Sequence, residues 1–303
     1  MREVYRINEA PPEALKNQEK LPADLYGSAT MTPEVVDADS INSFKITYTC
    51  GQNSIDAGTG ISMHVPTQGW SAPVLTPGER GYVEVETDAN AKLEAYLPEG
   101  PNTIHWVCIK VVKGSVKPGE MINIYYGGKG EDAPGAEAAN FIGDFTFMVA
   151  FTLNPFPKYA ESLWSPQHPG YCIFANRLEH EPVTATIGAK AERLHLTLPS
   201  TAKTGSKVSL IAQLMDRCHN PASRSEDVEA ALRWDSGEEL EKIVFTDEPF
   251  RREIEISMPD PEGVYYLFAE WNGETWMSNP VEVRKQVEQS IYWGDLHAQG
   301  AQS

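Results

Sequence analysis

Hydrophobic and polar residues alternate along much of the chain. Phe44, Ile46, Tyr48 and Cys50 are separated by polar residues, which is the period of two of a half-buried β-strand. Turn signals such as Pro77-Gly78 interrupt these patterns. No stretch shows a convincing helical period, so this first region is predicted to be all-β. Its other apolar runs predict strands at residues 83–85, 104–112, 121–126 and 145–151.

A second series of alternating segments begins near residue 192. Leu194, Leu196 and Leu198 alternate with polar residues. Asn272-Gly273, between two aromatic strands, is a strong signal for a β-hairpin. About seven short strands in about 95 residues are typical of an immunoglobulin-like sandwich. The remaining strands are predicted at residues 208–214, 243–245, 254–256 and 264–271.

These patterns divide the chain into four parts. We expect an extended N-terminal arm at residues 1–24 and a first β-sandwich domain at residues 25–190. That domain includes a connecting segment, residues 154–181, rich in proline and aromatic residues. An immunoglobulin-like β-sandwich is expected at residues 191–286, and a segment of different character at residues 287–303.

The charge of the chain excludes some classes of partner. Lys+Arg 25 against Asp+Glu 43 gives a net charge of −18, which repels phosphate backbones and anionic lipid. No apolar run approaches the roughly 20 residues that cross a bilayer. We therefore expect no nucleic acid and no membrane among the partners.

The cysteines bear on the compartment. They lie far apart and form no Cys-x-x-Cys pair, so they are predicted to be free thiols of a reducing compartment. The first residues also lack the apolar core of a signal peptide. A cytoplasmic location is expected, with a mature secreted or periplasmic form as the alternative. The four are Cys50, Cys108, Cys172 and Cys218.

The last residues of the chain hold the candidate chemistry. If residues 291–299 form a strand, Asp295, His297 and Gln299 share one of its faces. An imidazole nitrogen and a carboxylate oxygen can bind a divalent cation at about 2.0–2.2 Å. Such an ion lowers the pKa of bound water to about 7. Ordinary polar alternation at the end of a strand is the alternative explanation.

The same residues carry a resemblance to a known family. The segment Trp293-Gly294-Asp295-Leu296-His297-Ala298-Gln299 resembles the opening motif of the PHP-like (polymerase and histidinol phosphatase-like) metallohydrolase barrels. The whole chain resembles the front portion of a large bacterial domain-of-unknown-function family with that barrel at its C-terminal end. Matching stretches include Leu25-Tyr26-Gly27, residues 48–58, and residues 216–221, where His219 stands in place of the usual glycine.

This resemblance implies a hydrolase of phosphate, sulfate or related esters that uses Mn²⁺ or Zn²⁺. Asp295 and His297 would be metal ligands. Gln299, where many PHP proteins have a histidine, would contact the metal-bound water or the substrate. Because such a barrel needs about 250 residues, we expect two sandwiches followed only by the first strand of a truncated α/β metallohydrolase barrel. This accessory region would be inactive alone, and the small-molecule ester would bind through the missing catalytic domain.

A rival hypothesis is a non-catalytic β-sandwich binding module for a glycan or a protein partner. Trp70, Trp164, Trp271 and Trp276 would then form an exposed stacking platform. Against this, aromatic residues at strand positions more often belong to the core. A structural role, in which the sandwiches hold together a homo-oligomer, is compatible with the hydrolase hypothesis.

Overall fold

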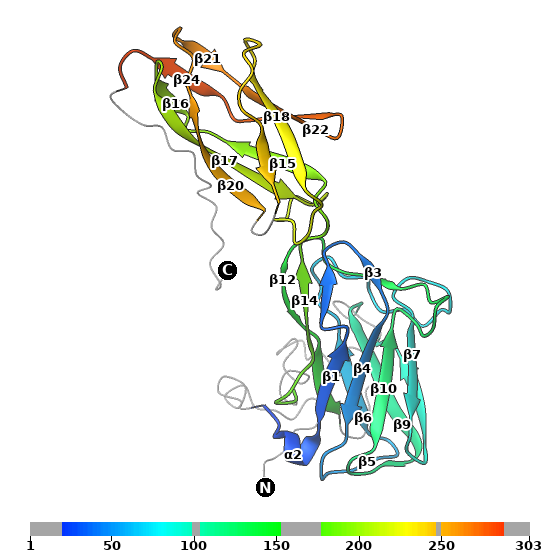
Figure 1. The fold of residues 1–303 in the computed structure, drawn as a ribbon. Coiled ribbons are helices and arrows are strands. Elements are labelled where there is room, and N and C mark those ends of the chain that lie inside the picture. The colour runs from blue at the N-terminus through cyan, green and yellow to red at the C-terminus, as the bar shows by residue number, and fades with distance from the viewer. Residues whose placement is uncertain (1–19, 99–103, 153–176, 247–249, 288–303) are drawn as a thin grey trace. The chain divides into compact units, whose positions relative to one another are not determined.

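The structure, a computed structural model, describes residues 20–98, 104–152, 177–246 and 250–287. Within these ranges the regular secondary structure consists of β-strands and one short helix, α2 (Ala23–Tyr26). The prediction of an all-β chain is therefore confirmed for the described residues. The chain divides into two compact units, residues 1–187 (unit 1) and 188–303 (unit 2), which are drawn in Figure 1 and described separately below.

Two sheets of unit 1 turn one face each into a single hydrophobic core. One sheet has the order β1-β4-β10-β7, and these are the strands Ser28–Thr32, Phe44–Thr49, Met121–Tyr126 and Val83–Thr87. The other has the order β13-β6-β9-β5, with β8 also paired to β9. Its strands are Met148–Thr152, Gly60–His64, Trp106–Val116, Ile55–Asp56 and Ala91–Tyr96.

The alternation in the sequence explains how these sheets bury one face. In β4, Phe44, Ile46 and Tyr48 are buried, while the residues between them are exposed or half-buried. The strand predicted there is confirmed, and Cys50, directly after it, is also buried. The Tyr48 hydroxyl donates a hydrogen bond to the Tyr26 carbonyl at 2.6 Å, so the phenol enters the core without losing its polar partner.

Shorter ladders complete unit 1. β12 (Gly143–Thr146) pairs with β14 (Val183–Ile187), which runs parallel to β2 (Val35–Asp37). β11 (Ala136–Glu137) pairs with β3 (Ile41–Asn42). At the start of the described chain Leu21 is buried, and its N–H donates to the Arg177 carbonyl at 2.8 Å. The last residues of the expected N-terminal arm thus pack into this unit.

The described part of unit 2 contains three ladders. The first has the order β15-β17-β20, the strands Arg193–Thr197, Lys207–Met215 and Arg251–Ser257. The second has the order β19-β18-β22-β23, the strands Ile243–Phe245, Val228–Trp234, Leu267–Trp271 and Glu274–Met277. The third has the order β16-β24-β21, the strands Thr201–Lys203, Val281–Arg284 and Gly263–Tyr265.

The second and third ladders follow one another along the chain. Only Tyr266 separates β21 from β22, and residues 278–280 separate β23 from β24. Strands of both ladders share one hydrophobic core with the first ladder. Short strands packed around one core agree with the immunoglobulin-like sandwich predicted for this part of the chain.

Two turns of unit 2 depend on particular residues. The predicted hairpin joins β22 to β23, with positive φ at Asn272 (52°) and Gly273 (77°), as a type I′ turn requires. The other turn follows Asp216, whose buried carboxylate accepts backbone N–H groups of Cys218, Asn220 and Ala189 at 2.9, 2.9 and 3.0 Å. In this turn His219 has φ of 67°, a conformation that favours glycine.

Candidate ligand pocket at one end of unit 2

The predicted metal site lies outside the described residues. Asp295, His297 and Gln299 all belong to residues 288–303, and the expected barrel strand lies there too. The metal, the ester substrate and the hydrolase therefore stay predictions. In the ranges that the structure describes, no three His, Cys, Asp or Glu side chains are grouped to hold a metal ion.

The predicted tryptophan platform does not form as one surface. Trp70 is only 5% exposed and packs edge-on against Phe145 and Phe147, with ring centroids 5.3 and 5.2 Å away. Its assignment to an exposed platform was wrong, because rings of β4 and of residues 145–147 enclose it in the core of unit 1. Trp164 lies outside the described residues. Trp271 and Trp276 are half-buried in unit 2.

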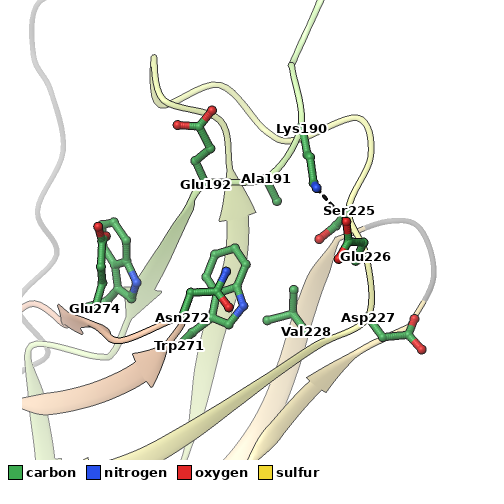
Figure 2. A pocket seen from close by; sticks show the side chains of 11 residues that line it. Lys190, Ala191, Glu192, Ser225, Glu226, Asp227, Val228, Trp271, Asn272 and Glu274 are labelled. Atoms are coloured by element: carbon green, nitrogen blue, oxygen red, sulfur yellow. Dashed lines mark hydrogen bonds and ion pairs between the residues drawn. The ribbon is translucent and has the colours of Figure 1, made fainter.

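These last two tryptophans line the same cavity, which we call the tryptophan pocket. It has a volume of about 390 Å³, within the range of small-ligand sites. Figure 2 shows the labelled side chains arranged around its open centre, with Lys190 and Glu226 joined on one side. The pocket is lined by Lys190, Ala191, Glu192, Ser225, Glu226, Asp227, Val228, Trp271, Asn272, Glu274 and Trp276.

Strand register explains why both indoles reach this cavity. Trp276 pairs with Ala269, which is fully buried in the core, so the two side chains share the inward face of the hairpin. Trp271 lies two residues beyond Ala269 on the same face and pairs with Glu274. The core continues beneath the pocket through Ala191 and Val228, both buried.

The pocket carries an excess of negative charge. Of its five ionisable side chains, Lys190 is the only base, and its Nζ lies 2.8 Å from Glu226 Oε1. The hydrogen bond from Lys190, followed by its charge, lowers the pKa of the Glu226 carboxyl. For Glu192, Asp227 and Glu274, the described part of the chain offers no ion-pair partner. Three carboxylates of the lining are therefore not paired with any base in the described part of the chain.

Trp276 is already in contact with a cation, whereas Trp271 is not. The Arg193 guanidinium lies over the Trp276 ring, 6.0 Å from its centroid. The Trp276 indole nitrogen is buried and has no hydrogen-bond acceptor in the structure. Among the described residues no cation is recorded over Trp271. The Trp271 ring is thus the surface that remains available to a ligand.

A second cavity of unit 2, about 800 Å³, runs along the outward face of β15 and β17. Its lining includes His195, Ser209 and Met277. The Ser209 hydroxyl already donates to Glu253 at 2.6 Å, and no group of charges converges there. The tryptophan pocket combines aromatic surface with unpaired charge and is the stronger candidate.

Unit 1 holds a different polar group, the histidine pair His64 and His105. Their ring centroids are 6.2 Å apart, and the Nδ1 atom of each is buried without a hydrogen-bond partner. Burial, with smaller contributions from His105 and Arg177, lowers the pKa of His64 to about 4. Burial also lowers the pKa of His105. Burial therefore favours the neutral form of both imidazoles, and the pair does not form a charged site.

Other expectations concern surroundings that the structure does not contain. The cytoplasmic location, the homo-oligomer and the exclusion of nucleic acid and membrane partners stay predictions. Within the described ranges, no helix has the length and apolar character needed to cross a bilayer. The described cysteines Cys50, Cys108 and Cys218 form no disulfide, and the first two of them are buried.

Comparison with known proteins gives only distant structural similarity. No family model and no curated protein matches the chain. Similar solved structures include adhesin InvE of Yersinia pseudotuberculosis (10% identity, TM-score 0.24, 84% of this chain and 58% of that one). Others are the Escherichia coli adhesin FdeC (10%, 0.29, 84% and 62%) and the C-terminal domain of the Streptococcus agalactiae polypeptide BspA (9%, 0.34, 84% and 99%). The chain thus spans about three fifths of the length of the two adhesin structures, and at these TM-scores its function must be inferred from its own geometry.

Proposed function

We propose that this chain is a non-catalytic β-sandwich binding module and that unit 2 binds a glycan in the tryptophan pocket. The observation that carries the proposal is the position of Trp271 and Trp276. Both project from the inward face of one hairpin into a single cavity, yet both stay half-buried. Covering apolar surface that is in contact with water lowers the free energy, so a ligand that packs on these indoles gains binding energy.

The remaining lining suits a sugar ring. A pyranose has an apolar face of C–H groups, which packs on an indole, and a rim of hydroxyls, which need hydrogen-bond partners. Glu192, Asn272 and Glu274 are exposed polar side chains beside the tryptophans and can supply those partners. Small-ligand sites are usually lined by apolar and aromatic side chains with a few polar groups that orient the ligand.

A glycan array probed with the intact chain tests the proposal. Hits are then titrated while the indole N–H signals of Trp271 and Trp276 are followed by NMR. We expect those two signals to shift together, and Trp271→Ala to weaken binding by about tenfold or more, which corresponds to about 1.4 kcal/mol.

Phe268→Ala is the matched control, because Phe268 is an aromatic residue of the same strand on its opposite face. It should leave the affinity unchanged. An array without hits, or binding that Trp271→Ala does not weaken, would refute the proposal. The predicted hydrolase depends on residues 295–299 and is not tested by this experiment.

A further inference from the structure

We infer that the glycan taken by the tryptophan pocket carries free amines, as an oligosaccharide of amino sugars does. This inference rests on the proposed function and names the chemistry that the pocket selects. Its basis is the charge around Trp271. Four carboxylates and one ammonium group line the cavity, so its ionisable side chains carry three net negative charges at neutral pH.

The single base does not balance this charge. Lys190 points toward Glu226, to which it is hydrogen-bonded, and both groups lie at the exposed rim. Their pairing neutralises one carboxylate of the four. Glu192, Asp227 and Glu274 keep their charges without an ion-pair partner in the described part of the chain. A neutral sugar would leave this field uncompensated, and an acidic sugar would be repelled by it.

One of these carboxylates is placed to act together with an indole. Glu274 pairs with Trp271 across the hairpin, so the two side chains leave the same face at directly opposed positions. An ammonium group over the Trp271 ring would gain the cation–π attraction and a charge-assisted hydrogen bond to Glu274. Trp276 already has the Arg193 guanidinium over its ring. Trp271 and Glu274 therefore form the subsite that recognises the amine.

The decisive ligands differ only in acetylation. A glucosamine hexamer and its N-acetylated counterpart have the same sugar backbone, but only the first has amines, which are protonated at about pH 6. Titration calorimetry on the intact chain should show the glucosamine hexamer binding about tenfold tighter or more. High salt should reduce that preference, because it screens the charges at this exposed pocket.

Three charge variants sharpen the test. Glu274→Gln should remove most of the preference for the amine while the acetylated hexamer still binds. Lys190→Met should raise affinity for the glucosamine hexamer about threefold or more, because it releases the Glu226 carboxylate. Glu241→Gln, an exposed loop position outside the pocket, makes the same change in net charge as Glu274→Gln and should have no effect.

The outcomes separate this inference from the proposed function. If the acetylated hexamer binds as tightly as the glucosamine hexamer and Trp271→Ala abolishes both, the glycan pocket stands and the amine preference is wrong. If neither hexamer nor any other glycan shifts the Trp271 and Trp276 signals, both proposals fail. If Glu241→Gln lowers the preference as much as Glu274→Gln, general charge attraction explains the binding and the amine subsite is wrong.

Discussion

Unit 1 encloses Trp70 in an aromatic cluster, whereas unit 2 leaves Trp271 and Trp276 half-buried at one end of its sandwich. Whether the tryptophan lies in a strand or in a loop does not explain this difference in burial. Trp70 lies in a loop between β6 and β7 and is buried, while the other two lie in strands and stay partly open. What decides burial is whether other segments of the chain cover the inward face at that position.

Different segments cover the tryptophans in the two units. Around Trp70, rings from β4, from β12 and from the residue between β12 and β13 meet. At the tip of the β22–β23 hairpin, the neighbouring segments are the residues before β15 and before β18, and a cavity remains between them. A core with no such opening serves stability, and an inward face that is left partly open is available for recognition.

The largest expected effect is the contrast between tryptophan deletions. Trp70→Ala should lower the free energy of unfolding of unit 1 by about 3–5 kcal/mol, the usual cost of emptying a buried aromatic site. Trp271→Ala should cost unit 2 only about 1 kcal/mol, because that side chain is already half in water. Hydrogen exchange is measured at increasing denaturant concentration, and peptides of each unit are followed separately. This gives the free energy of unfolding of unit 1 and of unit 2 for each variant. Equal losses would contradict the difference in burial.

Acid should lower the free energy of unfolding of unit 1 more than that of unit 2. His64 has a pKa of about 4 when folded, lowered from 6.5, so between these values the unfolded chain binds a proton that the folded chain does not. The free energy of unfolding should therefore fall as the pH drops from 6.5 to 4, by about 3 kcal/mol in total. The lowered pKa of His105 acts in the same direction. The described histidines of unit 2, His195 and His219, are exposed rather than buried.

The measurement is the same exchange experiment repeated across that pH range. His64→Gln should flatten the pH dependence of unit 1, whereas His180→Gln, at an exposed position of the same unit, should leave it unchanged. If both variants keep the wild-type slope, His64 is not the group responsible.

The smallest effect concerns the turn after Asp216. His219→Gly should raise the free energy of unfolding of unit 2 by about 0.5–1 kcal/mol, because glycine adopts the observed φ of 67° without steric cost. His195→Gly, in the extended strand β15, should lower stability by a similar amount. Thermal melting of both variants measures the two shifts, and two changes of the same sign would rule out this explanation.

Local patterns predicted many of the strands. β4, β10 and β17 follow their alternating residues, and Asn272-Gly273 forms its hairpin, because in each case the signal lies within a few neighbouring residues. β18 was missed although it alternates strictly in burial. Two neighbouring alanines show why: Ala230 is buried and Ala231 is exposed, but the sequence does not distinguish them. Alanine is a weak strand signal, and only the packed structure reveals that Ala230 lies in the core.

The pocket shows where sequence information ends. The chain itself determined that Trp271 and Glu274 flank a tight turn, and therefore that they share one face of a hairpin. Only the tertiary structure brought residues 190–192 and 225–228 beside that hairpin and buried Trp70 in the core of unit 1. The reason is physical: alternation fixes which way a side chain points relative to its own strand, but which distant segment covers it depends on how the whole chain packs.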